Sequence, residues 1–352
     1  MTSDLHFCFV VTGSHLQSAE AVIASLHKHN QVVRATILLV DGISSETKTR
    51  LNTSQIRILA PEDLGIQDLE HIRAFYNCFE LCNALRPWLI YHLLFTTGAT
   101  KVVYLDADLF VTGSFDRLSA ILDEKSFAFI PHVTAGLPLD GLKPDDLDFL
   151  RAGELNSGFW AFRASSNSER ALRWLRERIC LYGFDAPDEG MFVDQRLLAS
   201  VVLLFLGDFY LITDPGYNVA YWNLQDRPLE WQDGCCYANG HPLVFFHFSG
   251  FDPAEPTMLS RHGTRYRRCE EVPGLPRLVD EYMRLLAAQS NQPEAGIPQV
   301  RALPLAEPTP LMRRYYFRHR AFPRHRAWFR FLEWVAVTGR NFFQSLTNRL
   351  ID

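Results

Sequence analysis

The chain has 352 residues and a net charge of -5, and 47% of its residues are hydrophobic. Such a chain can bury one large core, so a disordered or fibrous protein is excluded. The negative charge gives no reason to expect a nucleic-acid partner. Seven cysteines without a repeated CxxC spacing argue against a zinc site, and the N-terminus lacks a secretory signal pattern. We therefore expect reduced thiols and a cytoplasmic protein.

The first sixty residues alternate between strand and helix patterns. Residues 6–11, 35–40 and 55–59 are apolar runs that predict strands, and residues 17–28 have helical spacing. Strands that alternate with helices at these lengths predict a mainly parallel sheet with crossover helices, which is an α/β fold.

Further along the chain the patterns are less regular. Residues 76–94 predict a long helix, in which Pro87 should cause a kink or start a new helix. The Gly- and Pro-containing stretch 137–153 predicts a loop. Two strands and one helix are predicted at residues 156–162, 243–248 and 168–182.

The C-terminal part differs in composition from the rest. Residues 286–310 are proline-rich and predict a linker. Residues 311–352 mix arginine with aromatic side chains and form a basic end on an acidic chain. We therefore expect a main domain at residues 1–285, the linker, and a helical basic tail.

Two aspartates follow a short, wholly apolar run. Asp106 and Asp108 come after residues 101–105 (KVVYL), which predict a buried strand at the centre of the sheet. The carboxyl ends of such strands are where α/β sheets bind ligands. Adjacent carboxylates repel each other unless a cation neutralises them, and Mn²⁺ or Mg²⁺ commonly shares its site with substrate phosphates. The pair therefore predicts a metal and phosphate site.

Two other interpretations of the aspartate pair stay open. A bare Asp-x-Asp is common, and its side chains can cap a helix or close a turn. A strand followed by Asp-x-Asp also opens the site of haloacid-dehalogenase-like phosphatases. Those enzymes have Thr or Val where this chain has Phe110.

The stretch from Lys101 to Leu118 resembles the core of glycosyltransferase family 8, and three further blocks follow in that family's order. The resemblance covers residues 5–270 and implies a GT-A fold, a need for Mn²⁺ or Mg²⁺, a nucleotide-sugar donor that is usually a UDP-sugar, and retention of the anomeric configuration. The blocks are Leu155-Asn156-Ser157-Gly158-Phe159, Asp194-Gln195 and His247-Phe248-Ser249-Gly250.

The resemblance assigns roles to individual residues. Asp106, Asp108 and His247 would be the protein ligands of the metal ion. The amides of Asn156 and Gln195 suit the binding of sugar hydroxyls better than general-base catalysis. The nearby carboxylate of Asp194 could act electrostatically or covalently, or it could cap a helix. We prefer a front-face mechanism in which the leaving phosphate takes the acceptor proton, but the sequence does not decide it.

Donor-binding residues are expected at the same edge of the sheet. Thr12, Gly13 and Ser14 follow the first strand, where the family begins its contacts with the nucleotide. Arg86 stands where related sequences have a basic residue that could clamp phosphate. An ordinary turn and a surface arginine beside Trp88 are the alternatives. The donor-binding set also includes Leu105, Ala107 and Gly250.

One departure from the family concerns a lysine that often follows the His-x-x-Gly segment. This chain has Phe251-Asp252-Pro253 there, so we expect Arg261 or Arg265 to supply the missing cation. Aromatic residues near two amides could form a sugar platform, although core packing is the alternative for each of them. They are Trp160, Tyr217, Tyr221 and Trp222, with Asn218 and Asn223.

The basic tail could lie on a membrane surface. An amphipathic helix within residues 311–350 would place arginines at lipid phosphates, although it could equally pack on the main domain or bind a partner. The sequence thus predicts a retaining glycosyltransferase with a saccharide or lipid-linked acceptor, located in the cytoplasm or peripherally on the inner membrane face. The alternatives are a catalytically silent sugar-nucleotide binder and the phosphatase.

Overall fold

The computed structural model describes residues 4–290 except for 44–47, 50, 68, 70–71 and 74–75. The expected tail and most of the expected linker lie outside the described residues. Helix α9 (Leu275–Ser290) continues past residue 286, so the expected linker begins inside a helix. Among the described residues, no helix is both long and apolar enough to cross a membrane.

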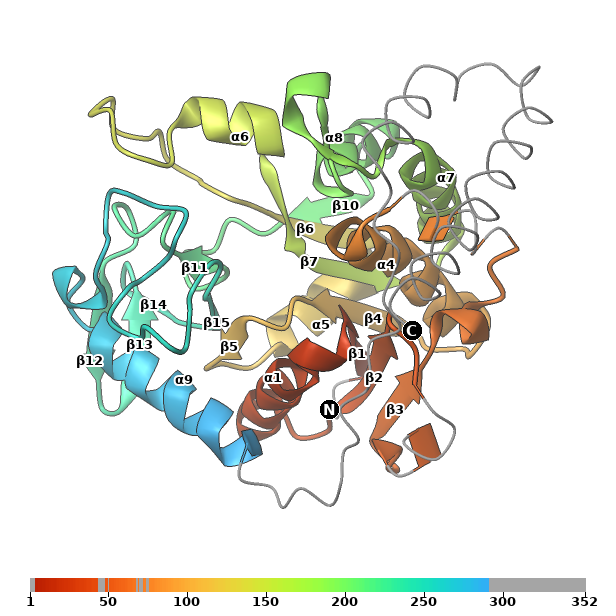
Figure 1. Cartoon of the computed structure of the whole chain (residues 1–352), viewed down its shortest axis with the longest axis horizontal. Coiled ribbons are helices and arrows are strands. Elements are labelled where there is room, and N and C mark those ends of the chain that lie inside the picture. The colour runs from red at the N-terminus through yellow and green to blue at the C-terminus, as the bar shows by residue number, and fades with distance from the viewer. Residues whose placement is uncertain are drawn as a thin grey trace, which may run out of the picture.

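The central sheet has seven strands in the order β10-β6-β7-β4-β1-β2-β3 (Figure 1). All pairs of neighbours are parallel except the two made by β7 (Leu155–Arg163), which runs antiparallel to β4 (Lys101–Leu105) and β6 (Phe127–Pro131). The mainly parallel α/β fold is confirmed, but the sequence patterns predicted neither β6 nor the reversed direction of β7. The other strands are β1 (Leu5–Val11), β2 (Arg34–Leu39), β3 (Ile56–Leu59) and β10 (Phe209–Leu211).

The sheet is buried on both faces, which explains the unbroken apolar sequences of its central strands. In β1, Cys8 and Val10 belong to a core shared with α4, α7 and α8. Phe7 and Phe9 point the other way into a core shared with α1 and α5. The helices are α1 (Leu16–His29), α4 (Cys78–Phe95), α5 (Asp116–Glu124), α7 (Ser166–Tyr182) and α8 (Gln195–Leu204).

The structure excludes one of the two alternatives for Pro87 and corrects the expected loop at residues 137–153. Helix α4 continues through Pro87 as one helix, so no second helix starts there. The stretch 137–153 is not only a loop, because it contains the short helix α6 (Asp146–Ala152). Asp145 caps this helix by accepting a hydrogen bond from the backbone N–H of Asp148, a signal that the polar composition of the stretch obscured.

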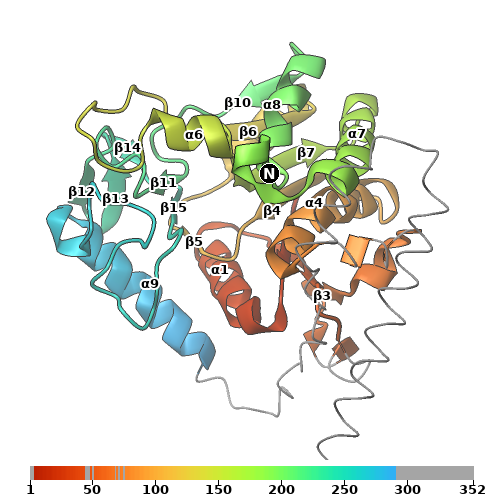
Figure 2. The ribbon, with the colours of Figure 1, turned by 45° about the horizontal axis from the view of Figure 1, so that its top comes forward.

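A second, three-stranded sheet stands beside the first. It joins β11 (Val219–Ala220), β15 (Phe245–His247) and β5 (Leu109–Val111). Helix α9 lies alongside α1 and closes a third core behind this sheet (Figure 1, Figure 2). The remaining strands are β8 (Asp185–Ala186), β9 (Met191–Phe192), β12 (Leu229–Gln232), β13 (Cys235–Ala238) and β14 (His241–Pro242).

The topology brings distant segments to one edge of the central sheet. The parallel strands β1, β2 and β4 all end there, and the reversed strand β7 begins there. The backbone N–H of Asp106, after β4, donates to the carbonyl of Gly158 in β7 at 2.9 Å. The two polar sequence blocks that follow β4 and open β7 are therefore in direct contact.

Candidate active site

A cleft of about 1450 Å³ lies at this edge of the sheet. Its lining includes the turn after β1, Asp41 after β2, the turn after β4, the start of α4 and several residues between Gly250 and Arg261. Five of the residues expected to bind the donor line it together with Arg86: Thr12, Gly13, Ser14, Ala107 and Gly250. Leu105 does not, because its side chain is fully buried in the core of the sheet.

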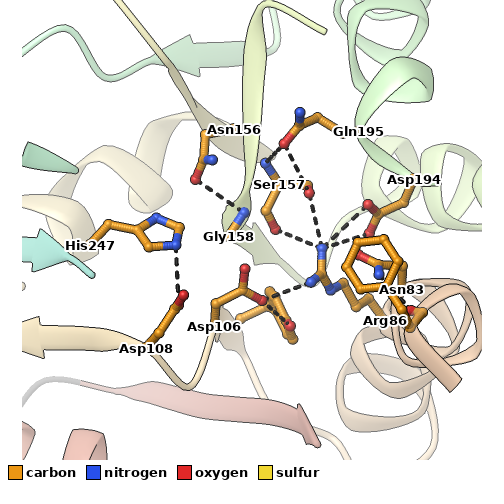
Figure 3. Close-up of polar contacts among 12 residues, drawn as sticks. Asn83, Arg86, Asp106, Asp108, Asn156, Ser157, Gly158, Asp194, Gln195 and His247 are labelled. Atoms are coloured by element: carbon orange, nitrogen blue, oxygen red, sulfur yellow. Dashed lines mark hydrogen bonds and ion pairs between the residues drawn. The ribbon is translucent and has the colours of Figure 1, made fainter. Parts of the chain in front are cut away.

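The three expected metal ligands come together in the structure (Figure 3). Asp106 and Asp108 flank the turn between β4 and β5, and His247 ends β15, which pairs with β5 opposite Leu109. One ligand atom from each of the three side chains lies within 4.8 Å of the others. The Nε2 atom of His247 is 3.1 Å from Oδ1 of Asp108.

The donor set and its surroundings fit a hard divalent cation. Two carboxylates and one imidazole suit Mn²⁺ or Mg²⁺, with the remaining positions open to phosphate oxygens and water. Within the described part of the chain, Oδ1 of Asp108 is buried and accepts no well-aligned hydrogen bond. Gly158 forms the floor, because a Cβ there would lie 2.6 Å from His247 and 2.9 Å from Asp106. The bare backbone leaves the space among the three ligands free.

The charges of Asp108 and His247 depend on one another. Burial favours the neutral form of Asp108, but His247 outweighs this effect and lowers the pKa of the carboxyl. Burial likewise opposes protonation of His247, but Asp108 outweighs it and raises the pKa of the imidazole. Each side chain therefore favours the charged form of the other, and a divalent ion between them would take over the neutralising role of the imidazolium.

Asp106 is held on one side by two donors. The hydroxyl of Tyr104 donates to Oδ1 at 2.5 Å, and Nη2 of Arg86 donates to the same oxygen at 2.7 Å. Its other oxygen, Oδ2, lies on the side of Gly158. No sequence pattern distinguished Tyr104 from its neighbours, because a tyrosine in a wholly apolar run is expected to be a core residue.

Arg86 is neither a surface arginine nor a free phosphate clamp. Its Nη1 atom donates to Asp194 at 3.0 Å and to the carbonyl and hydroxyl of Ser157 at 3.1 and 3.0 Å. The side chains of Arg86 and Asp194 are buried, and both ends of the guanidinium are bound to carboxylates. Arg86 reaches the cleft only as the partner of Asp106.

Asp194 stands at the N-cap position of α8, but its side chain makes no capping hydrogen bond. Burial raises the pKa of Asp194 to about 6, although the Arg86 guanidinium opposes this shift. The carboxylate is fully buried and is not part of the cleft lining. The structure thus places Asp194 behind the metal ligands, as the partner of Arg86.

The two expected amides are also occupied by protein groups. Oε1 of Gln195 accepts from the backbone N–H of Ser157 at 3.0 Å, and its amide nitrogen donates to the carbonyl of Ala152 at 3.0 Å. Nδ2 of Asn156 donates to Nε2 of His132 at 3.1 Å. We call the set Arg86, His132, Asn156, Ser157, Asp194 and Gln195 the buried network.

The aromatic residues divide into core and site. Trp160 packs against Tyr104 and Phe129, and Tyr217 packs against Phe115 and Phe245, so both belong to the core. The ring of Trp222 instead contacts the two site histidines: its centroid is 5.3 Å from that of His132 and 5.1 Å from that of His247. Tyr221 packs edge-on against Trp222 and lies near His262.

The two arginines proposed to replace the missing lysine differ in position. Arg261 lines the cleft and has no carboxylate partner among the described residues. Arg265 is not part of the lining; it pairs with Asp140 and donates to the carbonyl of Pro144. Arg265 therefore holds the 137–153 stretch, and only Arg261 is placed to face a ligand in the cleft.

Comparison with known proteins gives the class of protein. The sequence model of glycosyl transferase family 8 matches residues 6–168. The chain is 27% identical over 249 residues to the uncharacterized protein YfnF of Bacillus subtilis (strain 168), which covers 70% of this chain and 81% of YfnF. In fold it is similar to the apo structure of the bifunctional glycosyltransferase WbbM, with a TM-score of 0.50 at 15% identity over 84% of this chain and 51% of that chain.

The glycosyltransferase GlyE of Streptococcus pneumoniae TIGR4 is also similar, with a TM-score of 0.47 and 17% identity over 80% of this chain and 63% of that chain. This chain thus spans less than two thirds of the length of both solved chains. The family model and the similarity in fold to WbbM identify the chain as a glycosyltransferase with the GT-A fold. Its residues 6–168 carry the sequence of glycosyl transferase family 8.

Proposed function

We propose that the protein transfers a sugar from a UDP-sugar to a saccharide or lipid-linked acceptor, with retention of configuration and with Mn²⁺ or Mg²⁺ bound by Asp106, Asp108 and His247. The observation that carries this proposal is the convergence of these three side chains over the bare backbone of Gly158. A divalent cation there would neutralise charge on a departing diphosphate.

The charge of the cleft supports a bound cation. Carboxylates line much of it, from Asp41 after β2 through Asp106 and Asp108 to Asp252 and Glu255. Arg86 cannot balance a diphosphate, because two carboxylates already pair with it. Among the described residues, Arg261 is the only lysine or arginine in the lining that pairs with no carboxylate, so a dianionic leaving group would need further positive charge.

The transfer step forms a bond from the acceptor oxygen to the anomeric carbon and breaks the bond from that carbon to the diphosphate oxygen. The proton of the acceptor hydroxyl passes to the leaving phosphate, so no protein base is required. The burial of Asp194 and its pairing with Arg86 support an electrostatic role for this carboxylate rather than a covalent one. Asn156, Ser157 and Gln195 would hold the floor of the site in place.

The donor side of the cleft has groups that suit a nucleotide. Gly13 donates its backbone N–H to both carboxylate oxygens of Asp41 at 3.0 Å, which fixes the turn after β1. The hydroxyl of Thr12 and the ring of His15 are 2.9 Å apart at the mouth of the same turn. We propose that this turn contacts the nucleoside and that Arg261 contacts the diphosphate.

A thermal-shift screen of nucleotide sugars with and without Mn²⁺ would test the proposal. A rise in Tm that requires both the metal and one nucleotide would identify the donor base. Release of free nucleotide from that donor, with and without saccharide acceptors, would then separate a transferase from a silent binder. A protein that showed neither a metal-dependent Tm rise nor nucleotide release would contradict the proposal.

The membrane location remains a proposal that depends on residues 311–350, outside the described part of the chain. Their nine arginines and many aromatic residues would suit an anionic lipid surface close to a lipid-linked acceptor. Flotation with anionic liposomes should recover the full chain but not a 1–300 truncation. Equal flotation of the two proteins would contradict membrane binding through residues 311–350.

A further inference from the structure

Asn218 lies beside the imidazole that completes the expected metal site. Its Oδ1 is 3.1 Å from Nδ1 of His247, and both side chains are buried. The pairing of β11 with β15 brings them together, because Asn218 directly precedes β11 and Ala220 of β11 pairs with His247. The two residues are 29 positions apart in the sequence, so only the second sheet makes this contact.

The backbone of Asn218 restricts which residue can stand there. Its φ angle is 55°, in the left-handed region, which asparagine and glycine adopt more readily than other residues. Glycine would satisfy the backbone but would offer no hydrogen-bond acceptor. Asparagine satisfies the backbone and also supplies an oxygen next to the imidazole.

A neutral imidazole carries one N–H, and the nitrogen that carries it cannot bind a metal ion. The Trp222 and His247 rings pack in a T-shaped arrangement with an interplanar angle of 78°. This contact does not determine which nitrogen of His247 carries the proton. An acceptor beside Nδ1 does select it. Histidine ligands of metal ions commonly donate their other N–H to such an acceptor.

We propose that Asn218 is a positioning residue for the metal: its Oδ1 accepts the Nδ1 proton of His247 and leaves the lone pair of Nε2 for a divalent cation. The inference rests on the proposed function, because it requires that Asp106, Asp108 and His247 bind a metal.

A neighbouring asparagine shows what a purely structural role looks like. Oδ1 of Asn223 accepts from the backbone N–H of Ala220, and Nδ2 donates to the carbonyls of His132 and Asn218, all at 3.0 Å. Its amide is saturated by backbone groups. In Asn218, by contrast, Nδ2 is buried with no partner among the described residues, and the oxygen contacts only the metal-site histidine. The unpaired Nδ2 costs stability, so the hydrogen bond between Oδ1 and His247 is what favours an asparagine at position 218.

The test measures Mn²⁺ affinity of the full chain without nucleotide, from the electron paramagnetic resonance signal of free Mn²⁺. Asn218→Gly keeps the left-handed backbone and removes the acceptor, so Mn²⁺ should bind about 10- to 100-fold more weakly. Asn218→Asp keeps an acceptor oxygen and has no amide that could turn and donate, so affinity should stay within about threefold of the wild type or increase. Asn239→Gly is the matched control, because Asn239 also has a positive φ, of 48°, but lies in an exposed turn after β13.

The outcomes separate the inference from the function on which it rests. Wild-type affinity in Asn218→Gly would overturn the role of Asn218 while leaving the metal site intact. If the glycine variant does not fold, the aspartate variant decides, and a loss of more than about tenfold would overturn the inference. Absence of Mn²⁺ binding to the wild type would overturn both the inference and the proposed metal site.

Discussion

The metal corner, formed by Asp106, Asp108 and His247, and the buried network behind it are adjacent but differ in how their polar atoms are satisfied. In the buried network almost every charged atom has a protein partner: Arg86 is bound by two carboxylates, and Gln195 is bound at both ends of its amide. In the metal corner two carboxylates and an imidazole face each other, and a buried oxygen of Asp108 has no well-aligned partner among the described residues. A saturated set of charges supports structure, whereas an unsaturated one is available to bind a ligand.

The largest expected effect comes from breaking the metal corner. Asp108→Ala should reduce metal-dependent sugar transfer by about 1000-fold, because charge on the departing diphosphate is no longer neutralised. It should also abolish the Tm rise on adding Mn²⁺, while the stability of the metal-free protein should change little. Transfer rates at saturating Mn²⁺ and a metal-free urea titration measure the two parts. Undiminished transfer would refute the metal role.

Breaking the buried network should act on stability instead. Arg86→Met leaves Asp194 buried without its partner, which should lower the free energy of unfolding by about 3–5 kcal/mol. The double variant with Asp194→Asn should recover part of this loss, because no unpaired charge then remains. Urea unfolding without metal measures both. A loss below about 1 kcal/mol in the single variant would show that the network is not saturated as described.

The pH dependence of stability gives a sharper test of the same network. Burial lowers the pKa of His132 to about 4, so the folded protein binds this proton less readily than the unfolded chain, whose histidines titrate near 6.5. The resulting stability is present above about pH 6.5 and is lost as the pH falls toward 4, with a total of about 3 kcal/mol.

His132→Gln should therefore flatten the fall in unfolding free energy over this pH range. His6→Gln is the matched control outside the network, because burial, with Arg34 and Arg57, also lowers the pKa of His6 to about 4. Both variants should lose a similar part of the slope. Parallel curves for the wild type and His132→Gln would contradict a neutral, buried His132.

The smallest effect is expected at the rim of the cleft. Arg261→Ala should raise the KM for the donor about tenfold, because one charge-assisted contact to the diphosphate is lost. Arg265→Ala should leave the KM for the donor unchanged, because that guanidinium pairs with Asp140 outside the cleft. Steady-state kinetics on the two variants compares them directly. If Arg265→Ala raised the KM for the donor and Arg261→Ala did not, Arg265 would be the residue that contacts the diphosphate.

Sequence patterns alone determined the class of fold and the composition of the metal corner. The apolar run KVVYL could only be a strand buried on both faces, and the aspartates after it had to reach the carboxyl edge of the sheet. His247 was found because its sequence block resembles that of a family. These features are local in sequence, so they can be read from residue order.

The tertiary structure decided which polar groups are free to bind and which are already used. Arg86, Asp194 and Gln195 looked like ligand-binding residues. Only the antiparallel placement of β7 showed that Arg86 binds Asp194 and that Ser157 of β7 contacts both Arg86 and Gln195. Tyr104 and His132 were not predicted, and Asn218 was expected only beside a sugar platform. A buried hydrogen bond such as that between Asn218 and His247 joins residues far apart in the chain and leaves no pattern in either segment. Whether a side chain is satisfied depends on its neighbours in space, and these are set by the pairing of strands rather than by residue order.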